Sequence, residues 1–570
     1  MSQTHPPRQS PPSRAAPAAV RRGVDSRAVP RYDGAETLRL QPMAWRSARM
    51  ARLGAALAAV LLAALNAEAA IPGKKPDCIR LARNADWFKG EPLPAAGRKA
   101  ALDACIAMAE AQPMEDWPAQ LVARLFDQAE RPEEAFAWTV RAAETGDAGS
   151  IVALGVRHAT GDGTREDFDA AMALFQRAAA MDRADAMYHI GVMHRDGEGR
   201  PADPALAAEW FSMAMERGSY SGQRALAVLL RDGEGVPRKI DKAIEFLEPL
   251  AEADYTRAQI DLAILYDDLD RPADGIVWWR RAAEAGDAWA QAAYGYSLEK
   301  GDGIAKAPEQ AVEWYRKAAE QDHATGMWRL GRALCYGVAG AEDPEYGLPW
   351  LFRAADQGLP GAMLDIGFHY AKGKGLPLDG DAAEHWMRRS AEGGYDLALV
   401  WLGHIHHDGW ARPVDKREGV AWYRKAAKAG VAEGMTYVGL AYLHGEGAPL
   451  SEAAAGYWFG RAAAAGDLDG KVELAKLHAA GQGVDLSRER AVGLLREAAE
   501  SGHPEAMRRL GEMLLRGEGA AQDHVAGGKW LRKAAEAGDE AAAELLEAAS
   551  TGLFQVLRDA FEAAPKATTP

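Results

Sequence analysis

The stretch YVGLAYLHGEG, residues 437–447, decides the fold because the chain repeats it at a fixed interval. Related stretches are ALGVRHATGDG at 153–163, HIGVMHRDGEG at 189–199 and RLGEMLLRGEG at 509–519. Each ends in two glycines separated by one residue, and a second apolar block such as AAGYWFGRAAAA follows. Self-similarity at a period of 20–50 residues is the sequence signature of a solenoid or another repeat array.

Two columns of equivalent residues give the period. The first column holds His158, His194, Leu230, Tyr266, Leu298, Leu334, Tyr370, His406, Tyr442, His478 and Leu514. The second, mostly tryptophan, holds Leu174, Trp210, Phe246, Trp278, Trp314, Trp350, Trp386, Trp422, Trp458, Leu494 and Trp530. Both advance by 36 residues, except for one step of 32 residues where the glycine loop is replaced by DDLDRPADG. Eleven units therefore span about residues 148–539, after a shortened leading unit at 117–147.

Each unit is predicted to be a pair of helices. Ala398, Leu402 and His406 lie four residues apart, so they stack on one face of the first helix. Gly403 has no side chain and lets a second helix approach closely, while the glycine pair supplies the positive φ that ends a helix. Because one helix pair cannot bury its own apolar face, neighbours must stack, and we interpret the tryptophan column as the buried anchor of each repeat.

These residues carry a family resemblance. The pattern A-x-x-x-L-G-x-x-Y-x-x-G-x-G, followed by D-x-x-K-A-x-x-W-Y-x-K-A-A-E-x-G, resembles the Sel-1-like repeat, a relative of the tetratricopeptide repeat. The units at 288–323 and 396–431 match it closely. The resemblance implies an all-α, right-handed α-solenoid that serves as a scaffold or adaptor in protein assemblies, without catalysis. Some secreted members carry a disulfide in every repeat and are linked to β-lactam binding, but this chain lacks those cysteines.

The bulk composition excludes several classes of protein. The formal net charge of −15 argues against a nucleic-acid partner, which requires a basic stripe. The glycine pairs follow helices and lack the lysine of phosphate-binding loops, so no nucleotide cofactor is expected. The chain also lacks the G-x-S-x-G and H-E-x-x-H motifs of common hydrolases and metalloproteases. We therefore expect no cofactor and no enzyme.

The N-terminal part is predicted to direct export. Residues 1–42 are rich in proline and arginine and are expected to be a disordered leader, possibly upstream of a true start at Met43 or Met50. Residues 43–70 have a basic start, an apolar run from Leu53 to Leu65 and small residues near Ala69, which is typical of a secretory signal peptide. Export to the periplasm or the medium, with no membrane span after cleavage, is the expectation; a retained N-terminal anchor is the alternative.

The remaining segments are assigned as caps. Residues 71–147 are predicted to form an N-terminal cap with a degenerate repeat, and residues 540–570 C-terminal capping helices and a tail. An exported chain can form disulfides, and a bridge between Cys78 and Cys105 would contribute about 3 kcal/mol. Cys335, far away in the sequence, is predicted to be a buried small hydrophobe.

The stretch WLGHIHHDGW, residues 401–410, is the strongest departure from the repeat pattern. His406 belongs to the packing column, so His404 and Asp408, four residues apart, are the only weak candidates for a metal site. Trp401 and its equivalents vary from repeat to repeat, which predicts an exposed column. Aromatic residues gather at such positions in the middle units, and packing between repeats is one interpretation of them. The other is a candidate binding surface made of these residues: Trp289, Trp328, Trp401, His404, Asp408, Trp410 and Tyr437.

The function expected from the sequence is a non-catalytic protein–protein interaction scaffold or adaptor, in the cell envelope or secreted. Its partner would be an unidentified protein or peptide. Two alternatives stay open: a secreted hydrolase or metal-dependent enzyme that uses the His404 region, and an accessory module of envelope polysaccharide assembly, as the resemblance suggests.

Overall fold

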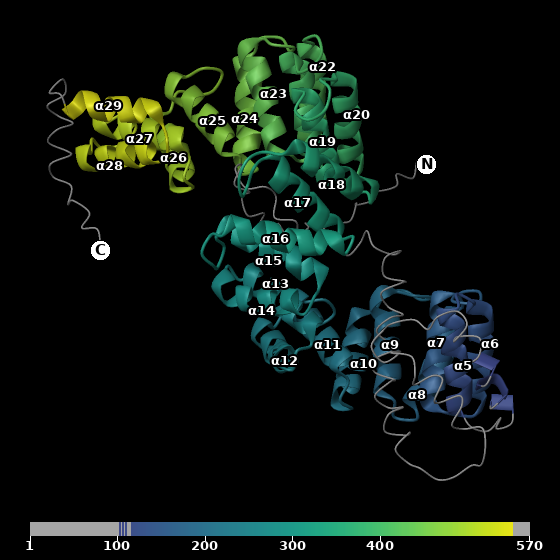
Figure 1. Cartoon of the computed structure of the whole chain (residues 1–570). Helices are drawn as coiled ribbons and strands as arrows, with labels where there is room; N and C mark the ends of the chain where they lie inside the picture. The colour runs from purple at the N-terminus through teal and green to yellow at the C-terminus, as the bar shows by residue number, and fades with distance from the viewer. Residues whose placement is uncertain (1–101, 104, 108, 111–115, 551–570) are drawn as a thin grey trace, which may run out of the picture. The chain divides into compact units, whose positions relative to one another are not determined.

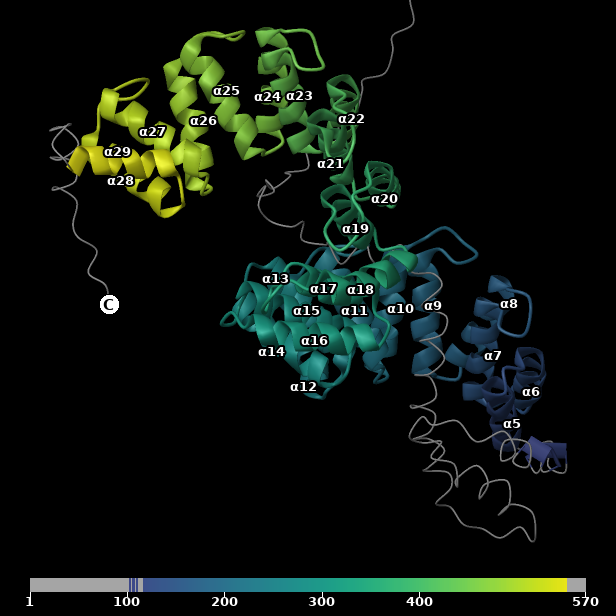
Figure 2. The same ribbon diagram turned by 45° about the horizontal axis from the view of Figure 1, so that its top comes forward.

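The computed structural model describes residues 102–103, 105–107, 109–110 and 116–550 (Figure 1). The leader, the signal segment and residues 551–570 lie outside this part of the chain. The chain divides into two compact units between Trp314 and Tyr315, and each is described by itself. From residue 116 to residue 550 the structure is helical and contains no strand, and the helices succeed one another in antiparallel pairs (Figure 2). The predicted all-α solenoid is confirmed.

The first unit contains a leading pair of helices and then four and a half repeats. The leading pair is α5 (Asp116–Gln128) and α6 (Pro132–Glu144). The repeats are α7 (Ala148–Thr160) with α8 (Phe168–Ala179), α9 (Ala184–Asp196) with α10 (Pro204–Glu216), α11 (Tyr220–Asp232) with α12 (Ile240–Glu252), α13 (Thr256–Asp268) with α14 (Pro272–Glu284), and α15 (Ala288–Lys300) followed by α16 (Pro308–Glu320), within which the division falls.

The second unit continues with six repeats and one final helix. They are α17 (Ala324–Cys335) with α18 (Pro344–Asp356), α19 (Pro360–Lys372) with α20 (Gly380–Glu392), α21 (Ala398–His404) and the short π-helix η2 (Ile405–Gly409) with α22 (Lys416–Ala429), α23 (Ala432–His444) with α24 (Glu452–Ala464), α25 (Leu468–Ala480) with α26 (Arg488–Glu500), and α27 (Pro504–Arg516) with α28 (His524–Glu536), followed by α29 (Glu540–Ser550).

The glycine pair has two separate physical roles. The first glycine ends the first helix: Gly445 has a φ of 71° and its N–H returns to the carbonyl of Ala441. The second glycine touches the previous repeat, since a Cβ on Gly447 would lie 2.1 Å from the carbonyl oxygen of Lys416. Only glycine combines a positive φ, here 71°, with that approach. The pair therefore caps a helix and locks one repeat onto the next.

The 32-residue repeat shows what the missing loop does. Helix α13 ends at Asp268 and α14 begins at Pro272, so a short turn replaces the glycine loop. Asp270 takes the positive φ of 58° that this turn needs, and aspartate tolerates that conformation better than most side chains. Pro272 starts α14 at a position where its missing N–H is not needed. The helix pair is preserved although four residues are lost.

Within each repeat, a glycine on the first helix receives a large side chain from the second. A Cβ on Gly403 would lie 2.2 Å from Tyr423 Cε1, and one on Gly439 would lie 2.5 Å from Phe459 Cε1. The expectation that Gly403 permits a close approach between helices is confirmed. The residues that fill these spaces are among the most deeply buried in the chain, including Phe175, Phe211, Tyr423 and Phe459.

The interpretation of the tryptophan column as the buried anchor is wrong for most repeats. The deepest column is the position one residue later, at Phe211, Leu247, Tyr315, Leu351 and their equivalents. The tryptophans lie beside it and are only partly buried, except Trp422 at 5% exposure. Their outer faces are covered by a cation three residues later in these pairs, at 3.3 to 5.1 Å from the ring centre: Trp138–Arg141, Trp278–Arg281, Trp350–Arg353, Trp386–Arg389, Trp422–Lys425, Trp458–Arg461 and Trp530–Lys533.

The predicted caps lie only partly within the described residues. Helix α29 packs Leu545 and Leu546 against the last apolar cluster, as a sealing helix would. Cys105 is buried and disulfide-bonded, and Cys78, its predicted partner, lies outside the described residues. Cys335 is free and fully buried, which confirms the prediction for it, and burial raises the pKa of its thiol to about 12.

Candidate recognition surface

The repeat of residues 396–431 departs from the others in its loop. Its glycine pair is reduced to Gly409, with a φ of 74°, followed by Ala411 with a φ of 56°. A non-glycine residue rarely adopts this conformation, and space for it is made by the previous repeat. Gly380 at the start of α20 leaves room there, since a Cβ on it would lie 2.5 Å from the Ala411 carbonyl oxygen. The last turn of the first helix is the π-helix η2, closed by the bond from Trp410 N–H to the Ile405 carbonyl at 3.1 Å.

First helices of neighbouring repeats contact one another in this unit, as α21 and α23 do. Side chains on these helices therefore meet across repeats, and six rings join here. We call this group the aromatic cluster: Phe368 on α19, Trp401 and His404 on α21, Trp410 in the loop, Tyr423 on α22 and Tyr437 on α23. It links three successive repeats.

Neighbouring rings of the aromatic cluster contact one another in space. The ring centres of Phe368 and Trp401 are 4.8 Å apart, and those of Trp401 and Trp410 are 6.0 Å apart. His404 stacks on Trp410 at 5.9 Å with the planes 12° apart, and it meets Tyr437 edge-on at 4.6 Å. Offset and edge-to-face contacts of this kind are favoured between aromatic rings. The cluster is a packed unit of which Trp401, Trp410 and Tyr437 remain partly exposed.

Asp408 orients two histidines beside these rings. His404 Nδ1 lies 3.1 Å from one Asp408 oxygen, and His407 Nδ1 lies 2.8 Å from the other. Burial lowers the pKa of His404, although Asp408 offsets part of the effect. For Asp408, burial acts to raise the pKa, but the bonds from His407 and His404 outweigh it and leave the pKa below its usual value. The carboxylate is therefore ionised beside a neutral His404.

The protonation of His404 follows from its partner. An ionised carboxylate only accepts hydrogen bonds, so Nδ1 of His404 carries the proton and Nε2 is left as an acceptor. Tyr423 Oη also lies 3.1 Å from that Nδ1. In the part of the chain that the structure describes, no group of three histidine, cysteine, aspartate or glutamate side chains could hold a metal. His404 and Asp408 make a hydrogen-bonded pair.

His406 points away from this pair, as predicted for the packing column. It is 7% exposed, and its Nε2 lies 3.2 Å from Glu384 Oε2 on α20. Arg412 and Arg388 contact the same glutamate. These groups belong to the interface between two repeats and are separate from the aromatic cluster.

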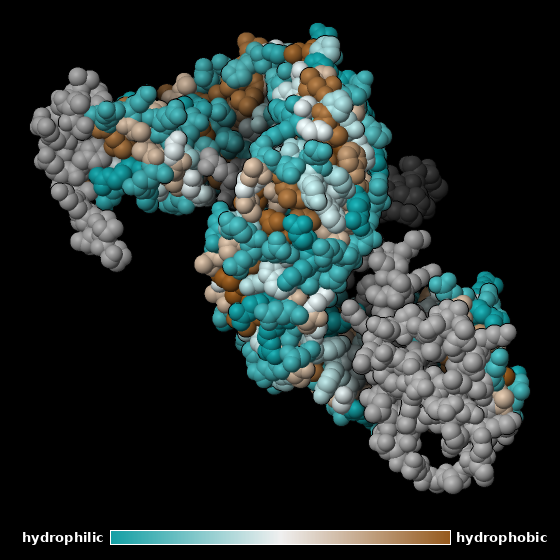
Figure 3. Space-filling view, viewed as in Figure 1, coloured by the Kyte–Doolittle hydropathy of each residue, from teal (hydrophilic) through white to brown (hydrophobic). Residues whose placement is uncertain are grey.

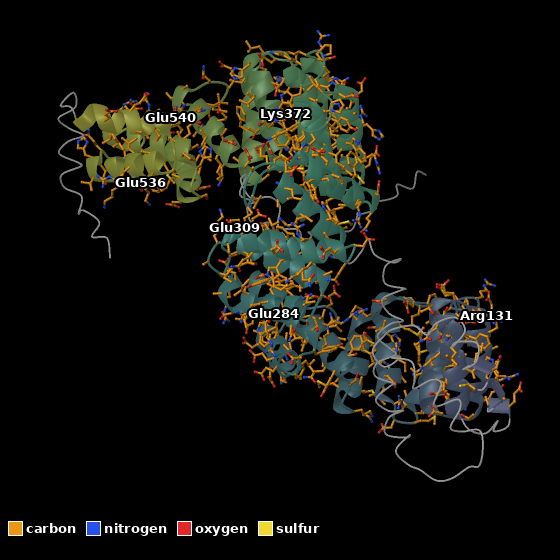
Figure 4. All side chains as sticks on the ribbon, viewed as in Figure 1. Arg131, Glu284, Glu309, Lys372, Glu536 and Glu540 are labelled. Carbon is orange, nitrogen blue, oxygen red and sulfur yellow. The ribbon has the colours of Figure 1, made fainter. Side chains whose placement is uncertain are left out.

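Two charged residues stand at opposite edges of the aromatic cluster without an ionic partner. The exposed Lys372, at the end of α19, places Nζ 3.5 Å from the centre of the Trp410 ring; Figure 4 labels this residue. Glu433 lies in the first turn of α23, one turn before Tyr437. Among the described residues, neither Lys372 nor Glu433 forms an ion pair or a side-chain hydrogen bond. Figure 3 shows hydrophobic patches between hydrophilic residues over the helices of this unit.

The carboxyl group of Glu433 is the most perturbed acid beside the cluster. Burial, together with Asp467 and Asp469, raises its pKa to about 7. A carboxyl with a pKa above its unfolded value of about 4.3 stabilises the fold below that value, and the contribution is lost as the pH rises through about 7. We expect Glu433→Gln to raise the thermal unfolding midpoint at pH 8 by about 2–5 °C, equivalent to about 1–2 kcal/mol, and to leave it unchanged at pH 4, below the unfolded pKa.

Glu392→Gln, on an exposed glutamate at the end of α20, is the matched control and should have no effect at either pH. Scanning calorimetry at the two pH values measures both variants. Equal midpoints for wild type and Glu433→Gln at pH 8 would show that the ionised carboxylate does not destabilise the fold.

The other two tryptophans of the candidate surface are not part of the aromatic cluster. Trp328 is 5% exposed and donates from Nε1 to Asp365 Oδ2 at 2.6 Å, so its prediction as an exposed residue is wrong. The equivalent of Trp401 one repeat earlier is the buried Asp365, which shows that the column of Trp401 is not uniformly exposed. Trp289 belongs to the first unit and contacts Trp279 with ring centres 5.6 Å apart.

Comparison with known proteins identifies the repeats. The Sel1 repeat matches eleven segments that together cover more than half of the chain: 148–182, 184–219, 221–255, 256–287, 290–323, 324–359, 360–395, 396–431, 432–467, 469–503 and 504–539. The chain belongs to the Sel1 repeat family. The predicted family and the predicted number of repeats are both confirmed.

Solved structures resemble this Sel1 repeat chain over much of its length. A protective antigen of uropathogenic Escherichia coli with an SLR fold is 25% identical, with a TM-score of 0.45, covering 76% of this chain and 98% of its own. A Sel1 repeat protein from Oxalobacter formigenes is 23% identical, with a TM-score of 0.37 and coverage of 60% and 90%. Yeast Tom70 is 13% identical, with a TM-score of 0.40 and coverage of 79% and 99%. No curated protein sequence matches the chain.

Four residues of the Sel1 repeat surface were missed by the sequence analysis: Phe368, Lys372, Tyr423 and Glu433. Of these four residues, only Tyr423 could have been predicted from the sequence. It occupies the deepest column, where Phe211 and Phe459 stand in other Sel1 repeats, and a hydroxyl group there needs a polar partner. That partner is His404. The other three become neighbours of the cluster only through contacts between repeats.

Proposed function

We propose that this protein is an exported, non-catalytic scaffold that recognises a partner protein through the aromatic cluster. Sel1 and related helical repeats typically mediate protein interactions, and the stacked first helices offer a continuous surface for this purpose. The observation that carries the proposal is the contiguous set of partly exposed rings with two unpaired charges at its edges. Aromatic residues in such positions dominate the binding energy of many interfaces.

Export is supported by the sequence of residues 43–70, which has the order of regions found in secretory signal peptides. In the described part of the chain, no helix has both the length and the apolar character needed to cross a membrane. The partner would then be met in the periplasm or the medium.

The test captures partners with the tagged full chain from separate envelope and cytoplasmic fractions of the source cells. We expect a partner from the envelope or secreted fraction that is retained by wild type and lost, by at least about tenfold, with Trp401→Ala/Tyr437→Ala, because two central rings are removed. Tyr457→Ala removes an aromatic side chain that is 61% exposed on a second helix and should leave capture unchanged.

Circular dichroism confirms that each variant is folded before capture. A partner retained by the double variant would reject this surface. A partner recovered only from the cytoplasmic fraction would contradict export.

A further inference from the structure

Above a pH of about 7, where Glu433 is ionised, the aromatic cluster carries opposite unpaired charges at its two edges, and this asymmetry specifies what it can bind. At one edge, Lys372 lies over Trp410 with its ammonium group unpaired by any described carboxylate. At the other edge, Glu433 is partly buried without a cation beside it. The charges sit on two first helices, α19 and α23, which are separated by one repeat.

A chain of contacts joins the two edges. Lys372 lies 3.5 Å from the Trp410 ring centre, Trp410 stacks on His404 at 5.9 Å, and His404 meets Tyr437 at 4.6 Å. One helical turn of about 5.4 Å then leads from Tyr437 back to Glu433. The edges are therefore on the order of 20 Å apart along this path, a distance that an extended peptide of about six residues covers.

The acidic edge contains more carboxyl groups than that of Glu433 alone. Asp467 and Asp469 act on Glu433 and raise its pKa, which places three carboxyl groups in one neighbourhood. Asp467 is partly satisfied by Thr436 at 2.7 Å and by the Gly470 N–H, and Asp469 accepts from His503. Glu433 has no such donor among the described residues. An incoming guanidinium or ammonium group would stabilise its ionised form, since a nearby cation lowers the pKa of a carboxyl.

We propose that the aromatic cluster binds an extended peptide segment of a partner protein that carries an acidic residue against Lys372, apolar side chains over the rings, and a basic residue against Glu433. This inference rests on the proposed function and names the chemistry of its partner. The rings supply contact area that does not depend on sequence, whereas the paired charges select the segment and its direction.

The test uses capped synthetic hexapeptides and the full-length protein. One peptide has aspartate first, arginine last and phenylalanine and leucine between; a second has the reverse order; a third replaces both charged residues with asparagine and glutamine. Both orders are needed because the direction of the bound chain is not given by side-chain contacts. We expect one charged peptide to bind about tenfold more tightly than the neutral one by calorimetry at low salt, where charge pairs are screened least.

Charge reversal provides the decisive variants. Lys372→Glu and Glu433→Lys should each weaken the preferred peptide about fivefold or more. The double variant should restore affinity but prefer the opposite order of charges. Glu392→Lys, at an exposed site on α20, should leave binding unchanged.

Equal binding of the charged and neutral peptides, or an unaltered preference in the double variant, overturns the inference. If the neutral peptide still binds and Trp401→Ala abolishes that binding, the recognition surface stands and only the charge selection fails. If no peptide binds wild type, the inference is rejected, while the capture experiment decides independently whether the surface recognises a protein.

Discussion

Replacing Gly403 with alanine should destabilise the repeat of residues 396–431 by about 2–3 kcal/mol or more. The added Cβ would lie 2.2 and 2.3 Å from two carbons of the Tyr423 ring, far inside contact distance. Tyr423 is 2% exposed, so its ring is enclosed by the surrounding side chains. Relief therefore requires the two helices to separate, and overpacking of this kind costs about 1–3 kcal/mol even where the core yields.

Gly403→Ala should lower the stability of its own repeat as well as that of the whole protein. Solenoid repeats contact chiefly their neighbours, so hydrogen exchange should accelerate first in α21 and α22. Tyr423 Oη also contacts His404, so peptide or partner binding should weaken with the same variant. Thermal unfolding and amide exchange measure the two effects.

Gly460→Ala is the matched control. Gly460 lies inside α24, and a Cβ there would meet no atom within 4 Å. Alanine is the better helix former by about 1 kcal/mol, so this variant should stabilise the protein slightly. Two glycine-to-alanine changes of opposite sign would show that close approach, and not helix propensity, governs Gly403. A stable Gly403→Ala protein with unchanged exchange in α21 would refute this account.

Removing the carboxylate of Asp365 should cost about 3 kcal/mol. Asp365 is 7% exposed on α19 and accepts from Trp328 Nε1 at 2.6 Å, while Arg332 Nε lies 3.4 Å from the same oxygen. Asp365→Ala leaves the buried indole N–H of Trp328 without its acceptor and removes one acceptor from the Arg332 guanidinium group; an unsatisfied buried donor costs about 1–3 kcal/mol, and more where a charged group is involved. Because Trp328 and Arg332 lie on α17, the loss should loosen the contact between two repeats.

A double-mutant cycle with Trp328→Phe isolates the bond from the tryptophan. We expect Asp365→Ala and Trp328→Phe to show a coupling energy of about 1–2 kcal/mol in chemical denaturation, since they share one hydrogen bond. Glu342→Ala breaks the exposed ion pair with Lys374 between the same two repeats and should cost less than about 0.5 kcal/mol. Additive effects in the cycle would mean that Trp328 is held by packing alone.

The repeat architecture could be predicted because its signals depend on residues close in sequence. The glycine that ends a helix and the side chains that stack four residues apart act within one helix pair, and recurrence shows them eleven times. Periodicity gives the phase of a helix, but it does not distinguish two adjacent positions that both point inward. For that reason the sequence pattern predicts the tryptophan column as the anchor, although the deeper position is the next residue, as Trp458 and Phe459 show.

Variation along a column was a poor guide to exposure. The column of Trp401 also contains Asp365, which is buried because Trp328 donates to it from the preceding repeat. A polar residue in a variable column can therefore be the satisfied centre of an interface between repeats. Likewise, Lys372 and Glu433 are ordinary charged helix residues in the sequence, and only the stacking of three repeats places them at the edges of one group of rings.

The pairing of Gly380 with Ala411 limits how the chain can be rearranged. Elsewhere the second loop glycine packs closely against the backbone of various residues in the previous repeat. Examples are Lys416 against Gly447 and Glu452 against Gly483. At this junction the glycine lies in the previous repeat and not in the loop. Ala411 occupies the loop position, and Gly380 leaves the space for it. The repeat of residues 396–431 could not be transplanted behind another repeat, or deleted and replaced, without its upstream neighbour. The order of the repeats is therefore constrained at the segment that holds the aromatic cluster, which must follow the repeat of residues 360–395.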